Sequence, residues 1–149
     1  MNVSIYQHSL YRHGLLATAL LFAATGCTWH LSPGAQQGSV NPEDVVFPEQ
    51  HSAWQKEGKI VEQNDIAKIK AGFTKEEIYQ VIGAPHFQEG FNAREWDYIL
   101  KFYDSNDNIE TCLYKIIFDN GYEGKLRGDS FQATEFYWQP VSCGQYANN

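Results

Sequence analysis

Three cysteines are the side chains of this 149-residue chain with the widest range of chemistry. A thiol can attack a substrate, bind a metal, form a disulfide or carry a lipid. The cysteines stand at positions 27, 112 and 143, which is not the paired spacing of a zinc site, and no histidine lies in a motif that would activate one of them. Cys27 and the pair of Cys112 and Cys143 therefore need separate explanations.

Other signatures of catalysis are missing from the sequence. There is no G-x-S-x-G, no H-E-x-x-H and no glycine-rich phosphate loop. Asp104, Asp107 and Asn108 are spaced like cation ligands, but they lack the glycine and the distal glutamate of a calcium loop, which favours a plain turn. His86 follows Pro85 in a predicted loop, where a structural role is favoured. We predict no enzyme, no catalytic residue, no metal site, no non-covalent cofactor and no small-molecule substrate.

Cys27 follows a segment with the marks of an export signal. Arg12 precedes the apolar run GLLATALLFAATG, which is too short to span a bilayer as a mature helix, and small residues at 24–26 lead directly into Cys27. The ending A-T-G-C looks like a bacterial lipobox, in which the cysteine sulfur takes a diacylglycerol. We therefore predict a signal peptide over residues 1–26 and a covalent lipid on Cys27. The alternative is an ordinary signal peptide with an incidental cysteine.

Residues 27–57 are predicted to be a flexible, lipid-anchored tether. They contain several prolines and glycines and show no sustained periodicity. The apolar exceptions either pack on the domain or dock a partner, and the sequence leaves both open; they are Val45, Val46, Phe47 and Trp54. The following domain is predicted over residues 58–149.

Residues 64–85 predict two short helices joined at a glycine. Thr74 and Glu77 have the spacing of a capping box, and Gly83 can take the positive φ that ends a helix. Asn64 is the expected cap of the first helix.

Beyond residue 85 the apolar period changes from helical spacing to strict alternation. Strands are predicted near 94–103, 109–118 and 132–139, with turn formers between the first two. The expected fold is α+β, with two short helices packed on one face of a three-stranded antiparallel sheet in the order ααβββ. The other face of the sheet is expected to be wetter.

This topology predicts a disulfide between Cys112 and Cys143. If the second and third strands pair antiparallel, the start of one lies beside the end of the other, where these two cysteines stand. An exported chain meets oxidising conditions, so we expect the bond to form. The alternative is two free thiols.

The charge balance limits the partners. A net charge of −7 argues against general affinity for nucleic acid or for anionic lipid headgroups. A local basic contact stays compatible with it.

The helix pair and the first strand carry a family resemblance. VEQNDIAKIKAGFTKEEIYQVIGAP, followed by F-x-x-x-x-WDY, resembles the small outer-membrane lipoproteins of the BamE family, also called SmpA/OmlA, over residues 58–118. Members have the ααβββ fold and are accessory subunits of the machine that folds β-barrel proteins into the outer membrane. The resemblance implies a non-enzymatic scaffold lipoprotein facing the periplasm. Phe73 and Gly90 depart from the family pattern, and so does the segment 119–149 with its cysteine. Thr28 in place of an aspartate after Cys27 also favours the outer membrane.

The resemblance also implies a contact surface. Its partners are the barrel subunit and companion lipoproteins of that machine, with phosphatidylglycerol as a lipid ligand. The matching positions lie before the first helix and before the first strand; they are Lys59, Ile60, Val61, Phe91, Asn92 and Arg94. Arg94 could meet a lipid phosphate or a partner carboxylate. Two alternatives stay open: Ile60 and Val61 as a short edge strand, and Phe91 as a residue that closes the sheet edge. The competing function is an envelope lipoprotein of the same fold that acts in stress or binds a periplasmic protein.

Overall fold

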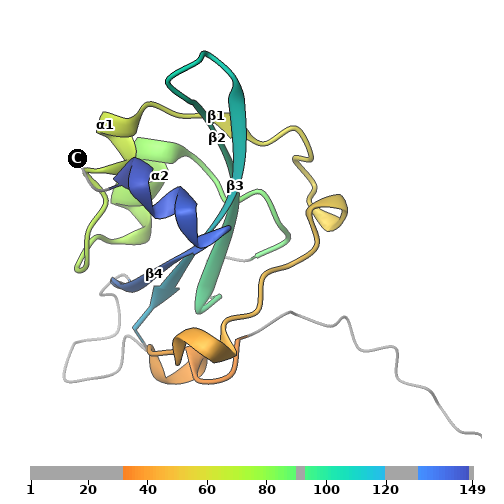
Figure 1. The fold of residues 1–149 in the computed structure, drawn as a ribbon. Helices are drawn as coiled ribbons and strands as arrows, with labels where there is room; N and C mark the ends of the chain where they lie inside the picture. The colour runs from red at the N-terminus through yellow and green to blue at the C-terminus, as the bar shows by residue number, and fades with distance from the viewer. Residues whose placement is uncertain (1–31, 90–92, 120–130, 148–149) are drawn as a thin grey trace, which may run out of the picture.

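The chain folds as an α+β domain around one twisted sheet (Figure 1). The computed structural model describes residues 32–89, 93–119 and 131–147. The sheet has the order β1-β2-β3-β4, with β1 at Lys59–Ile60, β2 at Glu95–Tyr103, β3 at Ile109–Phe118 and β4 at Ala133–Gln139. The three long strands pair antiparallel as predicted, since alternation fixes which face each side chain takes. The predicted signal peptide, Cys27, Phe91 and Asn92 lie outside the described residues.

One strand was missing from the prediction. β1 pairs parallel to β2 at the edge of the sheet, with Ile60 opposite Lys101. The described sheet therefore has four strands rather than three, and the edge-strand alternative for Ile60 is confirmed. Two residues are too few to show a period of two, so the alternation that predicted the other strands could not detect β1.

Two α-helices lie between β1 and β2, with α1 at Gln63–Ile66 and α2 at Lys75–Ile82. The capping box is confirmed, because Thr74 N donates to Glu77 Oε2 at 2.7 Å and Glu77 N donates to Thr74 Oγ1 at 3.2 Å. Gly83 ends α2 with φ at 87°. The Asn64 prediction was wrong: α1 begins one residue earlier, and Glu62 stands at its N-cap without a side-chain bond.

The first face of the sheet carries the main core. The alternating β2 residues face α1, α2 and the C-terminal 3-10 helix η4 (Val141–Ala147) on one side of the sheet (Figure 1). Their side chains are almost fully buried; they are Trp96, Tyr98, Leu100 and Phe102. The predicted disulfide is confirmed, and it joins β3 to η4 through Cys112 and Cys143 with 6.1 Å between the Cα atoms.

The second face is not wet, contrary to the prediction. Residues 32–58 run across it and include three short 3-10 helices, η1 (Ala35–Gln37), η2 (Pro42–Asp44) and η3 (Gln50–Ser52). Their apolar side chains cover those of the sheet in two small clusters: Ala53 and Phe47 with Phe87, Ile99 and Leu113, and Ala35, Val40 and Val45 with Ile117 and Tyr137. Burial of these apolar sheet residues favours the covered arrangement.

Polar contacts fix this segment, here called the cover (residues 32–58). Ser32 N lies 3.2 Å from both carboxylate oxygens of Glu95, and Ser32 Oγ donates to Oε2 at 2.8 Å. Val40 N donates to Glu135 Oε2 at 2.8 Å, and Tyr137 OH donates to Val40 O at 2.6 Å. The tether prediction is therefore wrong for residues 32–57. The structure places this irregular segment in the domain.

Candidate partner-binding surface

The predicted contact residues lie at opposite ends of β2. Ile60 is opposite Lys101 near the end of the strand, whereas Arg94 directly precedes its first residue, Glu95. At ~3.3 Å per residue these two levels are ~23 Å apart. The structure therefore divides the predicted surface into two separate parts.

The part beside β1 offers one exposed apolar side chain. Ile60 is 47 % exposed. Lys59 Nζ donates to Ile82 O at 3.0 Å, so it binds a carbonyl at the C-terminus of α2, where a cation also complements the helix dipole. Val61 is 9 % exposed and packs in the main core. Its side chain therefore supports the domain interior and not the predicted contact surface.

The part beside the start of β2 is built on Arg94. This side chain is half-buried, its Nη1 donates to Asp119 O at 2.9 Å, and its Cζ lies 4.4 Å from the ring centroid of Phe131. Stacking on an aromatic ring is typical of guanidinium groups and leaves further donors for an acceptor. The guanidinium of Arg94 is thus held in place by Asp119 and Phe131.

Lys75 supports the same region from beneath. It is the first residue of α2, and its buried Nζ donates to Ala93 O at 2.5 Å, next to Arg94. Its ammonium also lies 4.6–4.9 Å from the ring centroids of Trp96, Phe118 and Phe131. Burial, followed by the charge of Arg94, lowers the pKa of Lys75 to about 7. This burial could not be predicted from the sequence, since lysine in a first helical turn is normally exposed.

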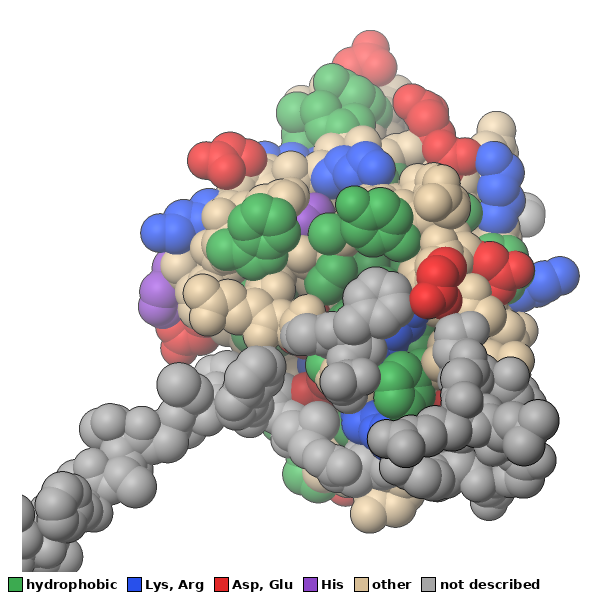
Figure 2. All heavy atoms as spheres, turned by 180° about the vertical axis from the view of Figure 1, so that it is seen from behind, with side chains coloured by type: hydrophobic (Ala, Val, Ile, Leu, Met, Phe, Trp, Pro, Cys, Tyr) green, Lys and Arg blue, Asp and Glu red, His purple; other side chains and the backbone are tan. Residues whose placement is uncertain are grey.

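A shallow groove lies between the cover and the end of α2. Its volume is about 560 Å³, and its lining is mostly aromatic and apolar, with one carboxyl group: Trp54, Tyr79, Ala84, Pro85, Phe87, Gln88, Glu89 and Trp96. Trp54 and Tyr79 are 54 % and 50 % exposed. Trp54 Nε1 donates to Pro85 O at 3.1 Å, which fixes the indole at the groove. Figure 2 shows that large apolar side chains gather at the surface on one face of the molecule, among charged ones.

A buried charge network lies under the cover. Lys115 Nζ is 2.6 Å from Asp97 Oδ2 and 2.8 Å from Glu95 Oε2, and all three side chains are almost inaccessible. Burial alone would lower the pKa of Lys115, but the carboxylates of Asp97 and Glu95 raise it. Burial raises the pKa of Asp97 to about 6, against the charge of Lys115. The network thus holds one cation between two carboxylates beneath the segment that Glu95 binds through Ser32.

Glu89 connects this network with the groove. Its Oε2 accepts from Asp97 N at 2.7 Å, and burial and the charge of Asp97 raise the pKa of Glu89 well above its usual value. Asp97 Oδ1 is buried and has no hydrogen-bond partner among the described residues. A side-chain hydrogen bond with Asp97 also contributes to the raised pKa of Glu89. Burial beside Asp97 therefore favours the protonated form of Glu89.

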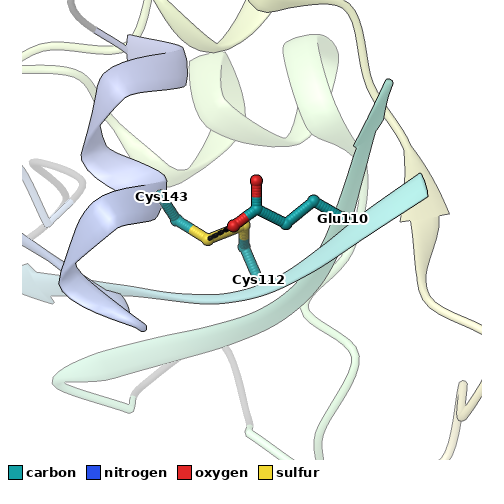
Figure 3. Close-up of side chains that lie close together, drawn as sticks. All are labelled: Glu110, Cys112 and Cys143. Atoms are coloured by element: carbon teal, nitrogen blue, oxygen red, sulfur yellow. Dashed lines mark hydrogen bonds between the residues drawn. A yellow bond between two sulfur atoms is a disulfide. The ribbon is translucent and has the colours of Figure 1, made fainter. Parts of the chain in front are cut away.

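One cluster resembles a metal site and is structural. Glu110, Cys112 and Cys143 bring their ligand atoms within 4.8 Å of one another (Figure 3). Both sulfurs belong to the disulfide, so they are not thiolate ligands, and Cys143 Sγ lies 3.8 Å from Glu110 Oε1 as a contact without a proton to donate. Glu110 Oε2 accepts from Tyr146 OH. The cluster fastens η4 to β3.

The two remaining polar candidates also have structural roles. His86 is buried, and its Nδ1 accepts from Ile99 N at 2.9 Å. Asp104 Oδ1 accepts from the backbone N–H groups of Asn106 and Asn108, which makes the predicted plain turn. Within the described ranges, no helix is both long enough and apolar enough to cross a membrane.

Comparison with known proteins supports one family. The family model described as the outer membrane protein assembly factor BamE domain matches residues 58–125. Proteins named outer membrane protein assembly factor BamE are 28 % identical over 75 residues in Polynucleobacter necessarius, 28 % over 78 residues in Neisseria meningitidis and 22 % over 94 residues in Xanthomonas campestris. The aligned parts are 50 %, 51 % and 62 % of this chain.

The similarity covers only part of each protein. The chain spans 33 %, 61 % and 72 % of the length of these three relatives, in the same order. The family match begins at residue 58 and includes β1, α1, α2, β2 and β3. Most of the cover lies before it.

Proposed function

We propose that this chain is a member of the BamE family, on the match over residues 58–125, and that it is an accessory, non-enzymatic lipoprotein of the machinery that assembles β-barrel proteins in the outer membrane. The observation that carries the proposal is the family match, together with three relatives named as assembly factors. The proposed partners are the barrel subunit and the companion lipoproteins of that machinery.

The surface of the domain suits such a scaffold. The groove beside Trp54 and Tyr79 is apolar and aromatic, and aromatic residues are enriched at protein interfaces. Ile60 adds an exposed apolar side chain at the edge strand. The main titratable groups of the described residues serve the fold: Lys115 and Asp97 pair with each other, and His86 binds the β2 backbone. Because these groups are engaged in structural contacts, they support a scaffold rather than an enzyme.

The proposed membrane attachment is a covalent lipid on Cys27. Acyl chains contribute roughly 0.8 kcal/mol per buried CH₂, so a multiply acylated cysteine holds a protein at the bilayer almost permanently. The domain would then face the periplasm from the outer membrane. Arg94, stacked on Phe131, is the proposed contact for the phosphate of phosphatidylglycerol, together with Phe91 and Asn92.

Affinity purification from detergent-solubilised envelopes tests the assembly role. The full lipoprotein should recover subunits of the barrel-assembly machinery, and a Cys27→Ala form with the same tag serves as the control for membrane attachment. Recovery of none of these subunits by an acylated, folded protein would count against the proposal.

A second function is favoured by one observation. The cover buries the second face of the sheet, so that face is closed to partners in this chain. An envelope lipoprotein that binds a different periplasmic protein, or acts in stress, is the resulting alternative. Deletion of the gene separates the two: lower levels of outer-membrane barrel proteins and higher permeability support assembly, whereas unchanged levels and permeability support the alternative.

A further inference from the structure

The cover ends in a polar clamp that fixes where the chain enters the domain. Ser32 donates through both its backbone N and its Oγ to Glu95, and the Glu95 carboxylate is also held by Lys115. Glu95 is the first residue of β2 and is buried. Ser32 is therefore fixed at the Glu95 end of the sheet and cannot move freely along the surface.

This clamp lies only five residues after Cys27. A chain spans at most ~3.6 Å per residue, so Ser32 stays within ~18 Å of Cys27 whatever path residues 28–31 take. β2 has nine residues from Glu95 to Tyr103, or ~26 Å at ~3.3 Å per residue. The distance along the strand is thus greater than the reach of the connection.

We propose that this short connection makes the end of the sheet around Ser32 and Glu95 the membrane-proximal end of the domain, within ~18 Å of the lipid surface. The inference rests on the proposed lipid at Cys27. With the β2–β3 turn at the bilayer, Ser32 would be farther away than its connection allows. The turn lies at the opposite end of the sheet from η1 (Figure 1). It therefore projects towards the periplasm.

The orientation assigns different neighbours to the two parts of the candidate surface. Arg94 precedes Glu95, so it lies at the membrane-proximal end, where a lipid phosphate is available. Ile60 pairs with Lys101 near the far end of β2, together with the exposed pair of Tyr103 and Ile109. That end of the domain faces away from the bilayer.

Paramagnetic labelling of the full lipoprotein tests the orientation. Gln37→Cys places a label beside the clamp on exposed η1, and Asn106→Cys places one in the β2–β3 turn, with the native disulfide left oxidised. Each acylated protein is reconstituted into vesicles of phosphatidylethanolamine and phosphatidylglycerol that contain a headgroup-bound relaxation agent. We expect several-fold stronger relaxation at Gln37→Cys than at Asn106→Cys. Equal relaxation, or stronger relaxation at Asn106→Cys, overturns the proposal.

A spacer variant and an acylation assay separate the causes. Insertion of about 20 Gly and Ser residues before Ser32 lengthens the connection to ~25 residues, with a root-mean-square span of ~27 Å, and should remove the difference between the two labels. A difference that persists with the spacer contradicts a role for the short connection. Mass spectrometry of the N-terminal peptide reports acylation of Cys27: its absence overturns the anchor and the orientation together, whereas equal relaxation in an acylated protein overturns the orientation alone.

Discussion

Lys115 Nζ lies 2.6 Å from Asp97 Oδ2 in the interior between the sheet and the cover, with neither side chain more than 2 % exposed. Removal of one member of a buried ion pair leaves an uncompensated charge, which typically costs about 3–5 kcal/mol. Lys115→Met should therefore lower the free energy of unfolding by ~3–5 kcal/mol. Urea unfolding at pH 7 measures this.

Lys68→Met is the matched control, because Lys68 also lies 2.6 Å from an aspartate, Asp65, but both side chains are well exposed. Exposed pairs contribute about 0–1 kcal/mol. If the two substitutions lower the free energy of unfolding equally, the buried pair contributes no more to stability than the exposed pair.

The carboxyl group of Glu89 predicts a pH-dependent effect. Burial and the charge of Asp97 raise the folded-state pKa of Glu89 above 4.5, so the folded protein binds more protons than the unfolded chain between 4.5 and that raised value. Glu89 therefore makes the protein less stable as pH rises through this window, by up to ~1.4 kcal/mol per unit. Glu89→Gln imitates the protonated form, so the variant should gain stability relative to the parent as pH rises above 4.5.

Unfolding of the parent and of Glu89→Gln at pH 5, 6, 7 and 8 checks this. Contributions from groups that do not contact Glu89 cancel in the difference between the two proteins at each pH, whereas Asp97, which bonds to Glu89, contributes to that difference. A difference that stays constant over the series would mean that Glu89 titrates normally.

The disulfide closes a loop between residues 31 positions apart. On the chain-entropy model, its removal costs roughly 3–4 kcal/mol. The double variant Cys112→Ala and Cys143→Ala should lose this much, as measured by urea unfolding. Addition of a reductant should destabilise the parent and leave the double variant unchanged. An equal response of both proteins would rule out the bond as the source.

Thr74 caps the helix that positions Lys75. Replacement of such a cap by alanine costs about 0.5–2 kcal/mol, and Thr74→Ala should lower the unfolding free energy by ~1 kcal/mol. Thr74→Ser keeps the hydroxyl acceptor and is the control. If serine is as destabilising as alanine, the Oγ1 contact to Glu77 N does not explain the stability of α2.

The sequence was most informative where a pattern repeats. The period of two in β2 and β3 predicted these strands and their buried face. Antiparallel pairing of the strands then placed Cys112 near Cys143 and so predicted the disulfide. The capping box gave the start of α2 because Thr74 and Glu77 bond to each other locally. These features depend on neighbours in the chain or on simple register.

The remaining features depend on contacts between distant residues. The cover is irregular, and its attachment through Ser32 to Glu95 joins positions 63 residues apart. Because the sequence does not show that the cover packs on the sheet, Ile99 and Leu113 were predicted to lie on a solvent-exposed face. For the same reason the residues that line the groove with Trp54 were not predicted. The groove was therefore not predictable. Phe91 and Asn92 stay predictions from the family resemblance.

Site-specific photocrosslinking in native envelopes tests the central claim that this chain is a scaffold of the barrel-assembly machinery. The probe replaces Ile60 or Phe91 in the acylated protein, and Val141, which is 85 % exposed on η4, is the control position. We predict products with the barrel subunit or its companion lipoproteins from Ile60 and Phe91, and none from Val141. The absence of such products from both test positions, in a protein that is acylated and folded, would contradict the account.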